Sequence, residues 1–189
     1  QLQALLRDLF PGRAHVVRNK ARHTTGTSYG ASAVRYALCS AETGGCAEGP
    51  ADLIAVDYDM NDGPVAPAEL ARETERLVRG APARAALLFV HQPYLGNLRT
   101  GLELFSGRGD VGAQEAKAPV VRHYGLPAVS YRDFMETAWR RDVAAEPDAR
   151  RRRSYFNAGT VHPPWSVHGL VAALVARRLL DARAAACAP

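Results

Sequence analysis

Short apolar segments alternate with segments of helical periodicity along the chain. The apolar segments are bounded by Pro, Gly or Asp, and they comprise residues 14–19, 52–59, 83–92 and 126–133. Near-continuous apolar strands of this kind are typical of a sheet that is buried on both faces. The pattern therefore predicts four strands of a mostly parallel sheet.

Helical patterns precede, separate and follow these predicted strands, at residues 1–10, 28–39, 66–80, 112–124 and 167–182. In the last of them, five apolar residues recur at helical spacing and form one stripe: Leu170, Val171, Leu174, Val175 and Leu179. Strands that alternate with helices predict an α/β fold with three α/β/α layers. The chain has 189 residues and no internal repeat or linker, so a single domain over residues 1–189 is expected.

Composition excludes several classes of function. The net charge is +5, but only Lys20 and Lys117 are lysines, and the Arg-rich run at residues 149–154 lacks the interleaved aromatic residues of an RNA-binding stripe. We therefore expect a solvated surface there and no nucleic-acid partner. No apolar run approaches the length of a membrane span. Because the sequence begins with Gln1, an upstream segment is expected. The compartment stays open between the secretory pathway or extracellular space and an organellar assembly.

The three cysteines have no zinc-binding spacing, and no metal site is predicted. Cys39 and Cys46 flank a short loop and would form a surface disulfide if the chain were exported. His162 and His168 lie six residues apart, but a third metal ligand is not apparent near them.

Polar segments follow the predicted strands, where ligands bind in open α/β sheets. They read "NKARHTTGTSYG", "DMNDG" and "HQPYLG", and "NAGTVHPPWSVHG" precedes the last helix. Their order resembles the SGNH (GDSL-like) hydrolase superfamily, most closely its plant and algal branch of esterases and carbohydrate O-acetylesterases. The resemblance runs along essentially the whole chain. It implies a flavodoxin-like sheet and cleavage of ester or O-acetyl groups with no metal or organic cofactor.

The resemblance also implies roles for individual residues. His162 matches the catalytic base, while the Asn61 side-chain amide and Gly26 match the oxyanion donors. Gly159 stands where the family has the aspartate that orients the base. The nucleophile is unknown, because the Gly-Asp-Ser turn is missing. The chain as written is therefore predicted to show no serine-type hydrolysis, and Ser28 is the first residue to examine if it does.

Several of these residues also have structural interpretations. His162 would pack in a turn beside Pro163, and His168 would serve at the entrance of the last helix. His91 is interpreted as a residue at the edge of the site. The segment from His23 to Ser28 would bind a ligand or cap the next helix, and residues 61–64 would form an ordinary turn.

Three functions follow as alternatives. The first is a hydrolase that acts on an acylated or O-acetylated substrate, such as a carbohydrate. The second is a catalytically inactive subunit of a larger assembly, and the third is the C-terminal part of a complete enzyme.

In the family, the strand that carries the nucleophile comes first in sequence and would lie between the strands at residues 14–19 and 52–59. We expect a segment upstream, a bound fragment or a neighbouring protein to supply this central strand, unless the two flanking strands pair directly.

Overall fold

The computed structural model describes residues 1–37, 51–62, 64–92, 111–131, 133–134 and 165–187. These residues belong to two compact units. One unit contains helices α1 (Leu2–Leu9) and α8 (Trp165–Ala186), and the other contains all the remaining described elements.

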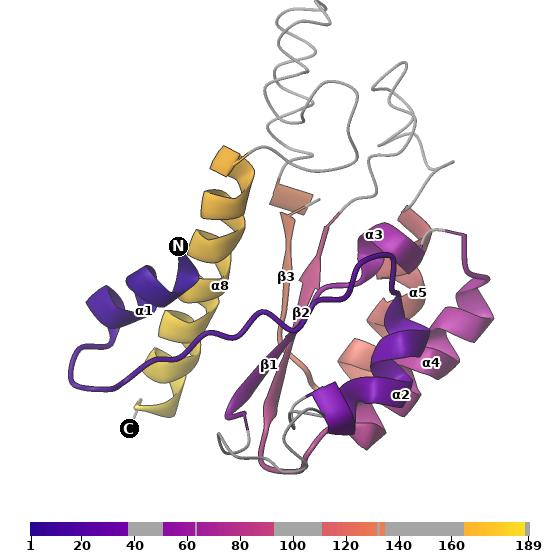
Figure 1. Ribbon diagram of the computed structural model, residues 1–189, viewed down its shortest axis with the longest axis horizontal. Helices are drawn as coiled ribbons and strands as arrows, with labels where there is room; N and C mark the ends of the chain where they lie inside the picture. The colour runs from indigo at the N-terminus through magenta and orange to yellow at the C-terminus, as the bar shows by residue number, and fades with distance from the viewer. Residues whose placement is uncertain (38–50, 63, 93–110, 132, 135–164, 188–189) are drawn as a thin grey trace, which may run out of the picture. The chain divides into compact units, whose positions relative to one another are not determined.

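The second unit is an α/β structure with a parallel sheet, as predicted. Its strands β1 (Leu53–Val56), β2 (Ala86–His91) and β3 (Ala128–Ser130) pair in that order. Figure 1 shows α2 (Thr27–Ala37), α4 (Pro67–Gly80) and α5 (Val111–His123) together on one side of this sheet. The arrangement of three layers remains a prediction.

The core of this unit lies between the sheet and these helices. Leu87 and Phe89 of β2 are buried against Leu77 of α4 and Val121 of α5. On the opposite face of β2, Leu88 and Val90 are also buried. The continuous apolar sequence of this strand therefore reflects burial on both faces.

Helix α4 shows why the sequence pattern located the helices well. Pro67 occupies the start of the helix, where its missing amide proton costs no hydrogen bond. The residues Leu70, Thr74 and Leu77 follow at helical spacing and are all buried. The other predicted helices are also confirmed, with bounds that differ by a few residues.

The prediction of a strand at residues 14–19 is wrong. The segment has no regular secondary structure, and Val16 and Val17 expose 70% and 41% of their surface. The backbone amide of Val17 donates to the Gln3 side chain at 3.4 Å and not to a neighbouring strand. An apolar segment becomes a strand only where another strand accepts its hydrogen bonds, and the described part of the chain provides none for this segment.

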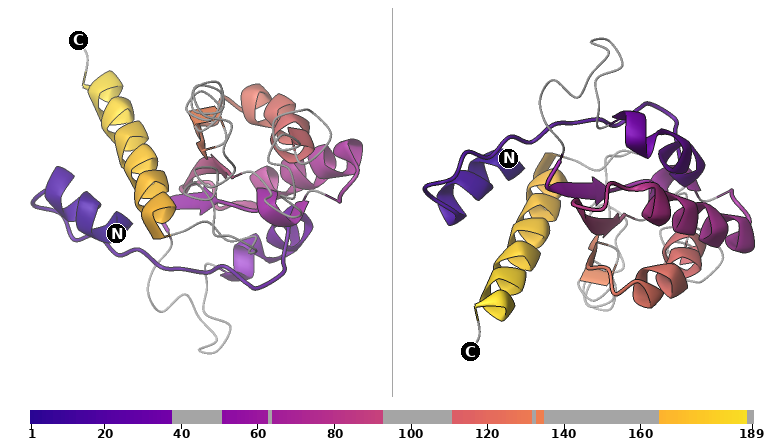
Figure 2. Two further views of the ribbon diagram at one scale, coloured as in Figure 1. Left: turned by 90° about the horizontal axis from the view of Figure 1, so that it is seen from above. Right: turned by 90° about the horizontal axis from the view of Figure 1, so that it is seen from below.

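The first unit is simple. Helices α1 and α8 contact each other, and Figure 2 shows them side by side. The guanidinium of Arg183 lies over the Phe10 ring, 5.6 Å from its centroid. None of the described helices is long and apolar enough to cross a membrane.

Candidate functional site

A cluster of buried polar side chains lies at the carboxyl ends of β1 and β2. We call it the acid–base cluster, and its members are Thr27, Asp59, Asp62, His91 and Lys117. None of them exposes more than 4% of its surface. They come from α2, the short helix α3 (Asp59–Asp62), the last residue of β2, and α5. Buried charged groups are rare unless they are paired, so each contact in the cluster needs an account.

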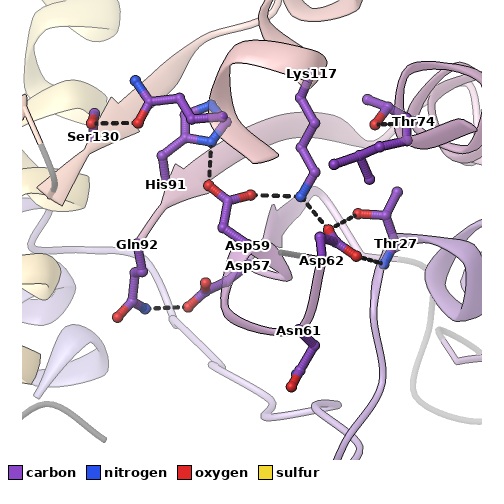
Figure 3. Close-up of polar contacts among 12 residues, drawn as sticks. Thr27, Asp57, Asp59, Asn61, Asp62, Thr74, His91, Gln92, Lys117 and Ser130 are labelled. Atoms are coloured by element: carbon purple, nitrogen blue, oxygen red, sulfur yellow. Dashed lines mark hydrogen bonds and ion pairs between the residues drawn. The ribbon is translucent and has the colours of Figure 1, made fainter. Parts of the chain in front are cut away.

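The two aspartates are the acceptors of the cluster (Figure 3). Asp59 is bonded to His91 Nδ1 at 2.7 Å through one oxygen and to Lys117 Nζ at 2.5 Å through the other. Asp62 contacts the same Lys117 Nζ at 2.5 Å. It also accepts from the backbone amide of Thr27 at 2.8 Å and from the Thr27 hydroxyl at 2.6 Å. Asp62 therefore caps the start of α2 from another element.

The contacts determine the charge state of Asp59. Burial alone would raise the pKa of this carboxyl group. The hydrogen bond from His91 and the charge of Lys117 outweigh burial, and the pKa of Asp59 is lowered from its usual value. Asp59 is therefore a carboxylate at neutral pH.

Asp57, two residues earlier, has the opposite shift. Asp57 is exposed as a whole residue, while its carboxyl group accepts from the Gln92 side chain. Loss of water around the carboxyl group and the nearby charge of Asp59 raise the pKa of Asp57 to about 6. Two neighbouring carboxyl groups whose pKa values are pushed apart are typical of acid–base sites.

Two of the three predicted site residues lie beside each other. The Asn61 side-chain amide donates to the carbonyl of Thr25 at 2.9 Å. Gly26 follows Thr25 and lies against Asp62 so closely that a Cβ atom there would clash with the Asp62 carboxylate. Asn61 and Asp62 end the short helix α3, and the Val65 amide donates to the Asp62 carbonyl at 2.9 Å in a turn directly after it.

The other histidines are spread over the chain. His162 and Gly159 lie outside the described residues, as do Cys39 and Cys46. His168 is in the first turn of α8, where its ring meets the Trp165 ring edge-on at 6.5 Å between centroids.

The segment from His23 to Ser28 leads directly into α2, but the side chain that accepts from the Thr27 amide at the start of the helix is Asp62. Thr25 donates to the Arg22 carbonyl at 2.9 Å, and α2 begins at Thr27. Cys187 is exposed and carries a free thiol.

The sequence analysis missed most of the acid–base cluster. It placed His91 at the edge of a site and assigned no role to Asp59, Asp62 or Lys117. One signal in the sequence could have pointed to Lys117. Only two of the 24 lysines and arginines are lysines, and Lys117 is one of them. A lone lysine in an arginine-rich chain suits a buried position where a compact charge with three donors is needed.

Within the described residues, no group of three or more His, Cys, Asp or Glu side chains is arranged to hold a metal ion. A shallow apolar depression lined by Val78, Pro82 and Leu126 lies at the opposite, amino-terminal ends of the strands. The polar chemistry of this unit is therefore concentrated at the carboxyl ends of the sheet.

Comparisons with protein-family models, with curated proteins and with solved structures found no match for the chain. Any function must therefore be argued from the acid–base cluster and from the neighbouring pair of Gly26 and Asn61.

Proposed function

We propose that the chain is a hydrolase-like domain of the SGNH type that acts on ester or O-acetyl groups, for example those of an acetylated carbohydrate. The observation that carries the proposal is the juxtaposition of Gly26 and Asn61, which are distant in sequence and meet beside the carboxyl end of β1. These are the two residues to which the sequence resemblance gives the oxyanion donors.

The surroundings of this pair support the role of donor. Transition-state stabilisation requires donors that are fixed before the reaction begins. Asp62 is held by Thr27 and Lys117, and it lies against Gly26. The turn that contains Gly26 is thereby attached to α3, which carries Asn61. In the proposed reaction, these donors would bind the oxygen that becomes negatively charged as the acyl carbon is attacked.

The proposal gives this activity to the chain itself, although the sequence motifs identify no nucleophile. The proposal retains His162 as the base that its sequence context suggests. It needs no metal or organic cofactor, because acyl transfer requires only a hydroxyl, an imidazole and oxyanion donors.

The proposal is tested by acetate release. Purified chain is incubated with p-nitrophenyl acetate and with an acetylated oligosaccharide, and the released products are measured. Asn61→Ala is expected to lower kcat/KM by roughly 10² to 10³-fold if its amide stabilises the oxyanion. Asn19→Ala is the matched control, because Asn19 lies in the other compact unit. A folded chain that releases no acetate from either compound would refute the catalytic proposal.

A second candidate is a non-catalytic subunit that receives a strand from another segment or protein. The observation that favours it is the edge of β1, because the described part of the sheet gives this strand one neighbour, β2. A parallel strand normally has neighbours or covering structure on every side, so an open β1 edge is suited to strand addition.

A further inference from the structure

We propose that Ser130, His91 and Asp59 form a nucleophile, base and acid across the carboxyl ends of the three strands. We call this set the Ser130 triad. It rests on the acyl-transfer function proposed above, and it supplies from within the chain the nucleophile that the sequence analysis could not find. In this arrangement His91 takes the role that the resemblance gives to His162.

The pair of Asp59 and His91 has the geometry of an oriented base. Asp59 is a carboxylate and can only accept, so His91 Nδ1 must donate in their 2.7 Å contact. In a neutral imidazole, the proton on Nδ1 leaves the lone pair on Nε2. No described residue forms a hydrogen bond with Nε2. The ring is therefore fixed in the tautomer that can take a proton from a hydroxyl group.

Asp59 is itself held in place on its other side. Its second carboxylate oxygen accepts from Lys117 Nζ at 2.5 Å while the first is bonded to His91 Nδ1. A carboxylate fixed beside the ring is the partner that orients the base of a catalytic triad.

The sheet register places Ser130 next to His91. The two residues are paired in the parallel ladder between β2 and β3, so their side chains project from the same face of the sheet. It is the face that also carries Leu87 and Phe89, because these residues alternate with His91 along β2. In Figure 3, Ser130, His91 and Asp59 follow one another in that order. The middle strand β2 thus carries the base, β3 carries the serine, and α3, which follows β1, carries the acid.

The hydroxyl of Ser130 is held close to this position by α5. Its Oγ donates to Gln114 Oε1 at 3.0 Å, and Gln114 precedes Lys117 by one helical turn. Rotation about the Cα–Cβ bond of Ser130 would turn the hydroxyl from Gln114 toward the imidazole. Hydrogen bonds between catalytic groups commonly tighten only when a substrate is bound.

The reaction can be written with balanced atoms. Ser130 Oγ forms a bond to the acyl carbon of the ester as its proton moves to His91 Nε2. The bond between the acyl carbon and the alkoxide oxygen breaks, and the proton passes from Nε2 to that oxygen. Water then attacks the acyl-serine, gives a proton to Nε2 and releases the acid, and Oγ recovers the proton. The net change is ester plus water to acid plus alcohol.

The test uses a fluorophosphonate probe and the full chain. The expected result is a covalent label on Ser130, located by mass spectrometry and lost after heat denaturation. Ser130→Ala should abolish the label and lower kcat/KM for p-nitrophenyl acetate by at least roughly 10³-fold. Ser32→Ala is the matched control, since Ser32 is exposed on α2 and its hydroxyl donates to the Ser28 carbonyl of the same helix at 3.1 Å.

His91 variants separate catalysis from structure. Because His91 is buried, His91→Asn is compared with the parent by circular dichroism before its rate is measured. Ser130→Cys supplies a second readout that does not depend on ester turnover. We expect alkylation of the introduced thiol to be slower by at least roughly tenfold when His91 is also replaced, because His91 would no longer help to form the reactive thiolate.

The outcomes distinguish the two proposals. Ester hydrolysis with the label on another residue, or with full activity in folded Ser130→Ala, would overturn the Ser130 triad and leave the proposed function intact. Loss of hydrolysis in His162→Asn but not in folded His91→Asn would do the same. A label on Ser130 without any ester turnover would support the reactive serine and refute the hydrolase, and a folded chain with neither would overturn both.

Discussion

Asp57 and Asp59 are two residues apart, yet their carboxyl groups experience opposite environments. Asp59 has His91 and Lys117 within hydrogen-bond distance, which lowers its pKa. Loss of water and the nearby negative charge of Asp59 raise the pKa of Asp57 to about 6, and among the described residues only the neutral Gln92 side chain donates to it. The difference arises from which residues of β2 and α5 reach each carboxylate, and a sequence pattern does not contain that information.

The raised pKa of Asp57 makes a prediction about stability. Between about pH 4 and pH 6 the folded chain holds a proton on Asp57 that the unfolded chain has lost, so the free energy of unfolding falls as the pH rises through this window. Asp57→Asn keeps an acceptor for Gln92 and removes the titration. We expect the variant to match the parent near pH 4 and to be more stable than the parent at about pH 7.5. Urea denaturation at the two pH values measures this, and equal effects at both would contradict it.

Residues of the site were predictable only where a local motif marks them. The resemblance assigns Asn61 and Gly26 the same role, and in the structure the two residues lie beside each other. His91 was recognised as the end of a strand but not as the partner of Asp59. Contacts between residues on different elements depend on register and helix packing, which no local pattern specifies.

The acid–base cluster joins α2, α3, α5 and β2 through the two aspartates of α3 and the lysine that they share. Lys117 comes from α5 and contacts both aspartates of α3, and one of these aspartates caps α2. Removing one member of a buried ion pair is more damaging than replacing the whole pair, because the remaining charge has no partner. Lys117 is therefore expected to contribute more to stability than any exposed ion pair.

Lys117→Met tests this expectation. The substitution leaves Asp59 and Asp62 close together without their shared cation, and we expect the free energy of unfolding to fall by about 3–5 kcal/mol. Arg177→Met is the matched control, because Arg177 pairs with Asp181 at 2.9 Å on the exposed side of α8 and should cost at most about 1 kcal/mol. Adding Asp62→Asn to Lys117→Met should recover part of the loss. Similar losses for Lys117→Met and Arg177→Met would show that the cluster does not stabilise the fold.

Most of the helices and strands were predictable from the sequence, and the exception is the segment at residues 14–19. The strands β1, β2 and β3 lie within the apolar segments that predicted them. The segment at residues 14–19 has a similar apolar pattern, yet it forms no strand. The segments that contain β1, β2 and β3 form one sheet, whereas the segment at residues 14–19 has no described strand beside it. Strand formation depends on a neighbour from elsewhere in the molecule, so composition alone could not separate these cases.

Among the described strands, β1 pairs with β2 alone, so its outer edge has no described neighbour. The backbone amide of Ala86 in β2 donates to the carbonyl of Asp52 at 2.9 Å. In a parallel ladder, alternate residues of a strand bond to the same neighbour, so the backbone of Ile54 faces β2 while that of Leu53 and Ala55 faces outward. A proline on an unpaired edge removes no hydrogen bond, whereas a proline in a central strand does.

Ala55→Pro and Leu88→Pro therefore compare a proline on the outer edge of β1 with a proline in the central strand β2. Leu88 lies in β2, which pairs on both sides, so Leu88→Pro should lower the free energy of unfolding by about 3 kcal/mol or more. Ala55→Pro should cost less than about 1 kcal/mol if the outer edge of β1 is open in solution. Chemical denaturation of both variants gives the comparison. If Ala55→Pro is as destabilising as Leu88→Pro, a strand already occupies that edge, and β1 cannot be the place where a further segment or protein is added.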